Sequence, residues 1–170
     1  MNSEELRALQ RPLKEKYGAD PGSALITLRA RGDLAEGVSC DVETGRALVR
    51  AGLHPATGGS GSEACSGDLL LQALVACAGV TLRAVATALG VELRGGSVSA
   101  EGDLDFRGTL GVDKAAPVGF KAIRLRFDLE GDLPPETADK LVRLTERYCV
   151  VYQTLKSSPP LELKIEARGR

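Results

Sequence analysis

One long apolar segment, residues 67–90, limits the folds open to this chain more than any other feature. It reads GDLLLQALVACAGVTLRAVATALG, with leucine, valine and alanine on almost every side of a helix built from it. A helix that is apolar nearly all round is buried by other elements. Gln72 and Arg83 interrupt the run, so we expect it to fall short of a membrane span. The sequence predicts a core helix with Ser66 as its N-cap and Gly90 at its C-terminal end.

Segments on both sides of this helix alternate between apolar and polar residues, which is typical of half-buried β-strands. Before the helix, ALITLRARG, VSCDVE and RALVRAGL predict a three-stranded antiparallel meander, and HPATGGSGSEACS predicts a loop. After it, VELRGGSVSAEGDLDFRG predicts strands with a turn at Gly95 and Gly96, and FKAIRLRFDLEG predicts a further strand. LPPETADKLVRLTERYCVVYQTL predicts a second long helix, and LELKIEAR a final strand. Strands in runs, punctuated by two helices, favour an α+β fold with antiparallel sheet packed on the helices.

The chain divides into a short arm and one domain. Residues 3–17 predict an amphipathic helix with a proline inside it, and the segment ADPGS then breaks the chain. We expect residues 1–20 to be a helical arm that docks on the main body or on a second subunit. We expect residues 21–170 to form a single domain.

Charge and composition exclude several classes of partner. The net charge is −1 and the charges are interspersed, which argues against a nucleic-acid or anionic-membrane partner. The first residues, MNSEELRALQRPLKEKYG, lack the apolar stretch of a signal peptide. We therefore expect a soluble, cytoplasmic protein that does not bind membranes.

The cysteines provide the clearest candidate chemistry. The sequence has 4 cysteines and 1 histidine, and the cysteines Cys40, Cys65, Cys77 and Cys149 show no paired spacing. Because zinc sites use closely paired ligands, we expect no metal site. In a reducing compartment such cysteines are often small buried hydrophobic residues, and this interpretation stays open for all of them.

Cys77 and Cys149 each lie on an apolar helix face. Their faces are Leu70, Leu74, Cys77 and Thr81 on the first helix, and Val142, Thr145, Cys149 and Tyr152 on the second. If the helices pack together, the two thiols meet, and one can attack a peroxide while the other condenses with the resulting sulfenic acid. The attacking thiolate would need a nearby cation. The candidates are Arg29, Arg31, Arg83, Arg107 and Arg147.

Other polar residues have simpler interpretations. His54, beside a proline, is most simply a turn residue with a backbone hydrogen bond, although a thiol hydrolase would have to use it. Asp103, Asp105 and Arg107 alternate on one strand and fit either a polar site or a solvated sheet face. The glycine-rich loop before the core helix lacks the lysine ending of a phosphate loop, which favours a lid or a surface loop.

Several segments together resemble the OsmC/Ohr family. They are SGDLLLQALVACAGVTL, a D-F-R-G segment, VGFKAIRLRFDL and ERYCVVYQTL. Members of that family carry a helix of the type LLLAAL-AC and a later helix containing YC-V. The resemblance runs from about Ala24 onwards, and the arm and the HPATGG segment are similar to a divergent OsmC-like branch.

The resemblance implies a two-layer fold in an intertwined homodimer, with active sites at the subunit interface. It implies a peroxidase that reduces organic hydroperoxides and is recycled by a dithiol or lipoyl-type reductant, without a metal, haem or flavin. Cys77 matches the reactive cysteine and Cys149 the resolving cysteine. Arg31 is the closest match to the arginine that holds the thiolate, with Arg29 as its rival.

The sequence departs from the family pattern just before the core helix. The family has a glutamate in a P-E-x-L context, where this chain reads S-G-D-L, so Asp68 or Glu63 would have to replace it. Two functional hypotheses follow. The first is a cysteine-based hydroperoxide reductase that acts in oxidative-stress defence, and the alternative is a non-catalytic module for small-molecule binding or redox sensing.

Overall fold

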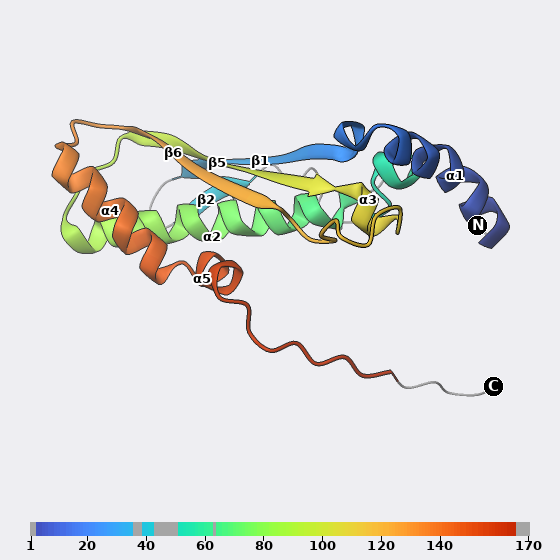
Figure 1. The fold of residues 1–170 in the computed structure, drawn as a ribbon. Helices are drawn as coiled ribbons and strands as arrows, with labels where there is room; N and C mark the ends of the chain where they lie inside the picture. The colour runs from blue at the N-terminus through green and yellow to red at the C-terminus, as the bar shows by residue number, and fades with distance from the viewer. Residues whose placement is uncertain (1–2, 36–38, 43–50, 63, 166–170) are drawn as a thin grey trace.

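The computed structural model describes residues 3–35, 39–42, 51–62 and 64–165 (Figure 1). Its main sheet has four strands in the order β2-β1-β5-β6, and all its neighbouring strands are antiparallel. The strands are β1 (Leu25–Ala35), β2 (Ser39–Val42), β5 (Gly95–Asp105) and β6 (Ala122–Glu130). The predicted mixture of helices and antiparallel sheet is confirmed.

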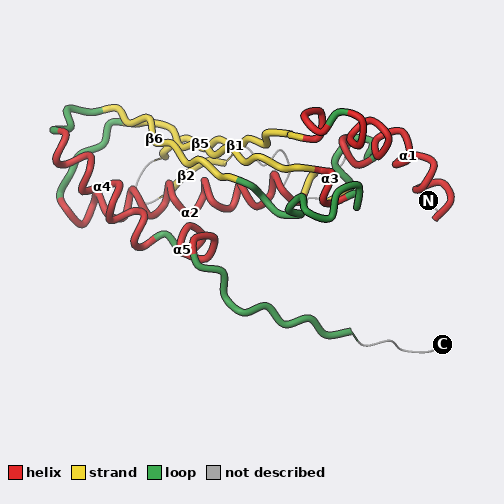
Figure 2. The backbone as a smooth tube through the Cα atoms, in the orientation of Figure 1, coloured by secondary structure: helices red, strands yellow, loops and turns green. Residues whose placement is uncertain are grey.

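The long helix α2 (Ser66–Leu89) runs beneath this sheet (Figures 1 and 2). Its buried face packs against the inward-facing residues of β5, among them Val98 and Ala100, both 0% exposed. The buried residues of α2 are Leu71, Leu74, Val75, Ala78, Gly79, Leu82, Val85 and Ala86. Each fully buried leucine contributes about 1.5–3 kcal/mol to folding, so this face holds the core together.

The sequence predicted the capping residue at one end of α2 but not at the other. At the C-terminal end, Gly90 adopts the left-handed conformation with φ 66°, and its N–H bonds the carbonyls of Ala86 and Thr87, as predicted. At the N-terminal end the expected Ser66 cap is wrong, because Cys65 occupies the N-cap position and makes no side-chain capping bond.

Helix α2 is also long and apolar enough, at 24 residues, to cross a membrane by length and composition alone. The expectation that it falls short of a span is therefore wrong on those two criteria. In the structure one side of α2 packs against the sheet and the C-terminal helices, which is the position of a core helix.

The predicted second helix is broken in two. It forms α4 (Pro135–Tyr148) and α5 (Val150–Lys156), with Cys149 between them in an extended conformation (φ −73°, ψ 108°). Two β-branched residues, Val150 and Val151, follow the break, and such residues lower helix propensity. The Cys149 sulfur accepts a hydrogen bond from the Tyr152 N–H at 3.5 Å and so caps α5.

The N-terminal helix α1 (Ser3–Ala19) docks on the main body. Tyr17 is 2% exposed, and its hydroxyl donates a hydrogen bond to the Ala56 carbonyl at 2.7 Å. Gln10 donates to the Thr57 carbonyl at 3.3 Å. Both acceptors belong to the short 3-10 helix η2 (Pro55–Thr57), and a second 3-10 helix, η1 (Pro21–Ala24), joins α1 to β1.

Several local predictions are wrong. The strand β5 is continuous from Gly95, so two strands, not three, separate α2 from α4. The D-F-R-G segment forms a short helix, α3 (Phe106–Thr109), because the Asp105 side chain caps it. In the predicted third strand, residues 46–50 lie outside the described residues. The part that is described, β3 (Ala51–Gly52), pairs in parallel with β4 (Ala64–Cys65) and not in the main sheet.

The predicted final strand is also absent from the described part of the chain. Residues 157–165 run away from the main body without a strand partner (Figure 2). Leu161, Leu163 and Ile165 are 88%, 99% and 93% exposed. The described part of the chain offers these side chains nothing to pack on.

Candidate functional site

The structure brings Cys77 and Cys149 together, although they come from different helices. Cys77 lies in the middle of α2 and is half-buried, whereas Cys149 lies at the break between α4 and α5 and is 0% exposed. Both are free thiols, and their side chains are hydrogen-bonded to one another. The extended backbone at Cys149 separates α4 from α5, and the first residues of α5 lie against Cys77.

The surroundings of Cys77 favour its thiolate. Burial alone raises the pKa of the Cys77 thiol, but hydrogen bonds outweigh burial and the pKa is lowered overall. These bonds come from the backbone amides of Val151 and Val150 and from the side chains of Cys149 and Thr81. Because the thiolate is the nucleophilic form, Cys77 is the better attacking thiol of the pair.

Cys149 has the opposite properties. Burial raises the pKa of Cys149 to about 11, and the neighbouring Cys77 adds to this effect, while backbone amides of Tyr152 and Val151 act against it. Cys149 therefore stays protonated at neutral pH and donates a hydrogen bond to the Cys77 sulfur. The two thiols are chemically unequal, as an attacking and a resolving cysteine need to be.

Two cavities lie along β6 and α5, and the smaller one reaches Cys149. The larger, of about 430 Å³, is lined mainly by apolar side chains of β6 and α5, with Lys121 and Lys156 among them. The smaller, of about 130 Å³, includes Thr145 and Cys149 in its wall. Leu125 and Tyr152 line both cavities, so the two adjoin.

Arg31, the predicted thiolate partner, pairs through its backbone with Ser99, and its rival Arg29 pairs with Glu101. The side chains of both arginines lie outside the described part of the structure, so the predicted contact with Cys77 stays a prediction. Backbone register places them on the strand adjacent to β5.

The two candidate replacements for the family glutamate have different outcomes. Glu63 lies outside the described residues. Asp68 lies in the first turn of α2, where burial raises its carboxyl pKa and nearby His54 partly lowers it. A helix rises about 1.5 Å per residue, so Asp68 lies about 13 Å from Cys77 along the same helix and does not contact it within one chain.

The other candidate residues have structural partners. The His54 Nδ1 accepts a hydrogen bond from the Ala56 N–H at 3.0 Å, and its ring stacks on Phe106 with centroids 5.0 Å apart, which fits the turn role predicted for it. Asp103 accepts from the Thr27 hydroxyl at 2.7 Å and from Arg124 at 2.6 Å. Cys65 occupies the N-cap position of α2 and packs against the core, and the side chain of Cys40 lies outside the described residues.

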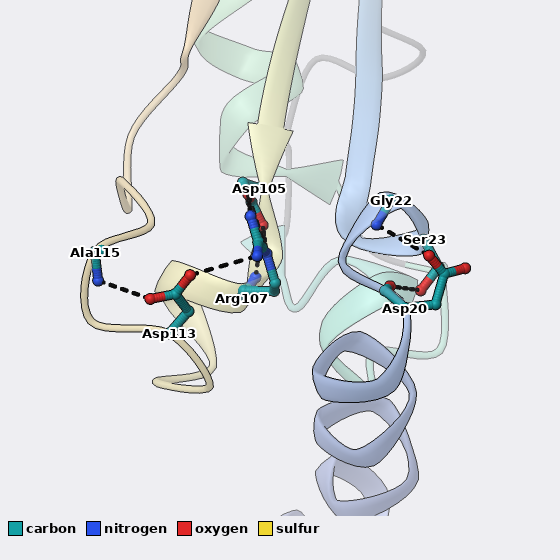
Figure 3. Close-up of polar contacts among 7 residues, drawn as sticks. All are labelled: Asp20, Gly22, Ser23, Asp105, Arg107, Asp113 and Ala115. Carbon is teal, nitrogen blue, oxygen red and sulfur yellow. Dashed lines mark hydrogen bonds and ion pairs between the residues drawn. The ribbon is translucent and has the colours of Figure 1, made fainter.

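Arg107 belongs to a charged cluster at the far end of β5. Figure 3 shows its guanidinium between two carboxylates, with Nη2 2.6 Å from Asp105 Oδ2 and Nη1 3.4 Å from Asp113 Oδ2. Two further candidate cations also have partners away from the thiols. Arg83 donates to the Leu93 carbonyl at 3.1 Å, and Arg147 lies over the ring of Tyr148.

Sequence reasoning placed Thr81 and Thr145 on the helix faces of the two cysteines but gave neither a role. Thr81 contacts the Cys77 sulfur from one helical turn away. The spacing of four residues between a cysteine and a threonine in each helix was the available signal. Within the described ranges, no three His, Cys, Asp or Glu side chains are grouped so that they could hold a metal ion.

Comparisons with known proteins bear on the family and the fold of this chain. The family model described as OsmC-like protein matches residues 59–164. One similar solved structure is an OsmC-like hydroperoxide resistance protein from Jannaschia sp. CCS1, with a TM-score of 0.61 and 21% sequence identity. The alignment covers 85% of this chain and 95% of that one, and at this identity it bears on the fold alone. No curated protein matches the chain. Because the family model covers more than half of the 170 residues and includes both cysteines of the pair, the chain belongs to the OsmC-like family.

Proposed function

We propose that this protein is a thiol-dependent peroxidase that reduces organic hydroperoxides in oxidative-stress defence. The observation that carries the proposal is the contact between two free thiols of unequal acidity, Cys77 and Cys149. The mainly apolar side chains that line the cavity at Cys149 and the larger cavity next to it favour an organic peroxide over hydrogen peroxide. In this proposal the protein works in a reducing cytoplasm, and the side chain of Arg31 stabilises the thiolate.

The proposed reaction uses the two sulfurs in turn. The Cys77 thiolate attacks the terminal peroxide oxygen, the O–O bond breaks, and the alkoxide takes up a proton and leaves as an alcohol. Cys77 is then a sulfenic acid, and Cys149 attacks its sulfur to form a disulfide and release water. A dithiol, of lipoyl type or similar, supplies the two electrons that restore both thiols. The sulfurs carry the electrons, so the cycle needs no bound cofactor.

The test is dithiol-dependent turnover of an alkyl hydroperoxide. We expect turnover by the wild type and its loss, by at least about 1,000-fold, in Cys77→Ser, because a serine hydroxyl is not ionised at neutral pH. Cys65→Ser is the matched control and should keep wild-type turnover. Equal turnover by the wild type and Cys77→Ser would refute the proposal.

The alternative function is a binding or redox-sensing module without turnover. The absence of the family's P-E motif and the complete burial of Cys149 favour it. Mass spectrometry after one equivalent of peroxide separates the two. Rapid formation of a Cys77–Cys149 disulfide supports the peroxidase, and two unmodified thiols support the binding module.

We further propose that two copies of the chain form a homodimer. Three alternating apolar residues of the C-terminal segment, Leu161, Leu163 and Ile165, are almost fully exposed. The strand β6 lies at one edge of the sheet, and edge strands have unpaired backbone groups that can add another strand. Helix α2 also exposes Leu70 and Val80, at 38% and 39%. A second copy would cover these surfaces.

Sedimentation of the purified protein tests the dimer. Leu163→Arg should weaken association by about 10- to 100-fold, because a buried leucine contributes about 1.5–3 kcal/mol. Lys164→Ala, on the polar side of the same segment, is the control and should leave association unchanged. A wild-type protein that sediments as a monomer would contradict this part of the proposal.

A further inference from the structure

The small cavity beside Cys149 has a polar group that the rest of the structure does not use. Its volume is about 130 Å³, and it lies between β6, α4 and α5. The walls are mainly apolar, from Leu125, Phe127, Val142 and Tyr152. Thr145 and Glu146 of α4 complete the wall together with Cys149, which follows α4 at the break. The Glu146 carboxylate is paired with Lys156 at 2.6 Å, so its charge is balanced.

The Thr145 hydroxyl is buried without a partner. Thr145 is 1% exposed, and no hydrogen-bond partner for its Oγ1 atom exists among the described residues. Buried polar groups are nearly always hydrogen-bonded, so such an exception points to a partner that binds there. A hydroxyl in the wall of a cavity can donate to a ligand in that cavity.

The chemistry of thiol–disulfide exchange determines which sulfur of a Cys77–Cys149 disulfide a reducing thiolate attacks. When a thiolate attacks a disulfide, the sulfur of the more acidic thiol leaves more readily. Cys77 is that thiol, because hydrogen bonds lower its pKa while burial raises the pKa of Cys149. The attacked sulfur is then Cys149, and attack comes in line, from the side opposite Cys77. The small cavity touches Cys149 and does not touch Cys77.

On the basis of the proposed peroxidase cycle, we propose that the small cavity receives one thiolate of a dithiol reductant, which accepts a hydrogen bond from Thr145 and attacks Cys149. This assigns the reductant a site of its own on the protein. The cavity volume suits a single slender thiol arm. The adjoining larger cavity, which shares Leu125 and Tyr152, has room for the remainder of an apolar reductant.

The exchange balances in two steps. First, a bond forms between the reductant sulfur and the Cys149 sulfur, the Cys77–Cys149 bond breaks, and Cys77 leaves as the thiolate. Second, the other thiol of the reductant, once deprotonated, attacks the first reductant sulfur and closes the reductant's disulfide. Cys149 leaves and takes up that proton, so the reductant gives up two electrons and both protein sulfurs are restored.

The first experiment measures reduction of the disulfide, which is made with diamide so that no peroxidase activity is needed. Dithiothreitol is added, and release of thiols is followed in time. Thr145→Val keeps the shape of the side chain and removes the hydroxyl, so we expect reduction about 10-fold slower than in the wild type. Thr145→Ser should restore most of the rate, and Thr154→Val, an exposed threonine on α5, is the control.

The second experiment identifies the attacked sulfur. The diamide-oxidised protein is mixed with 2-mercaptoethanol, quenched in acid and mapped by mass spectrometry. We expect the mixed disulfide on Cys149 and a free thiol at Cys77. A mixed disulfide on Cys77, an unchanged rate in Thr145→Val, or no disulfide after diamide would each overturn the proposal. Loss of peroxide turnover, with the Thr145 effect intact, would refute only the proposed function.

Discussion

The charged cluster at the end of β5 and the surroundings of the thiol pair in the middle of α2 differ in whether their buried polar groups have hydrogen-bond partners. In the charged cluster, the Asp105 carboxylate is 1% exposed and receives three hydrogen bonds from the Arg107 side chain, at 2.6, 3.0 and 3.2 Å, and one from its backbone N–H. Around the thiols, by contrast, the hydroxyl of Thr145 has no partner among the described residues.

The difference separates residues that fix the fold from residues available for chemistry. The hydrogen bonds from Arg107 hold the pKa of the Asp105 carboxyl below its usual range, so this carboxylate stays ionised. The thiols have weaker donors, namely backbone amides and hydroxyls, and their pKa values move in opposite directions. The ion pair between Asp105 and Arg107 is therefore structural, and the reactive centre is built from weakly polar groups.

Among the tests of this comparison, the largest expected effect is the difference in reactivity between the two thiols. Peptide-resolved labelling with iodoacetamide from pH 6 to 11 should give a midpoint for Cys77 below the ordinary range of cysteine. For Cys149 the midpoint should lie near pH 11, where burial places its pKa. At pH 7.5 the thiolate fractions should differ by at least about 100-fold, because each pKa unit is a factor of ten.

Burial also slows labelling of Cys149, so the midpoints and not the absolute rates decide the outcome. Cys65, which is half-buried, serves as the internal reference within the same digest. Equal midpoints for Cys77 and Cys149 would remove the chemical inequality on which the comparison with the charged cluster rests.

Thr81 offers the second test. Its hydroxyl contacts the Cys77 sulfur and lowers the pKa of that thiol. Thr81→Val should therefore slow the reaction of Cys77 with an alkyl hydroperoxide by about 10-fold, the value of one hydrogen bond to a charged group. The pH profile of the reaction should also move to higher pH. Stopped-flow measurement of sulfenic acid formation follows both quantities.

A matched control lies further along the same helix. The Thr87 hydroxyl donates to the Arg83 carbonyl at 2.9 Å on the exposed surface, away from the thiols. Thr87→Val should leave the rate and the pH profile unchanged, and Thr81→Ser should restore both. A slower reaction without a shift in the pH profile would indicate a packing role for Thr81.

The sequence predicted the elements whose signals are local. The apolar pattern of α2, the left-handed glycine at its end and the alternation of β6 each depend on neighbouring residues, and all three were confirmed. The sequence did not predict α3, because that helix needs the Asp105 cap and the packing of Phe106 against His54 from a distant segment.

The site was predictable only as a pair of cysteines. The resemblance and the helix faces placed Cys77 and Cys149 together, but the break at Cys149 was not visible in a segment with helical periodicity. That break exposes the amides of Val150 and Val151 to Cys77, and so produces the unequal pKa values. The alternation in LELKIEAR has the pattern of a strand, but strand formation requires a neighbouring strand, and the described part of the chain does not supply one.

The smallest expected effect tests the charged cluster as a structural element. Arg107 holds the pKa of the Asp105 carboxyl below its usual value of about 4, so its contribution to stability is full above that pH and is lost as pH falls through the lowered pKa. Asp105→Asn keeps the cap and removes the charge, so Tm at pH 7 should fall by about 3 °C. The difference from the wild type should shrink as pH falls below about 4.

Asp128→Asn, in an exposed pair with Arg126, is the control and should not change Tm measurably. A Tm difference for Asp105→Asn that does not shrink at all as pH falls below about 4 would show that the carboxylate's charge is not what stabilises this end of the sheet.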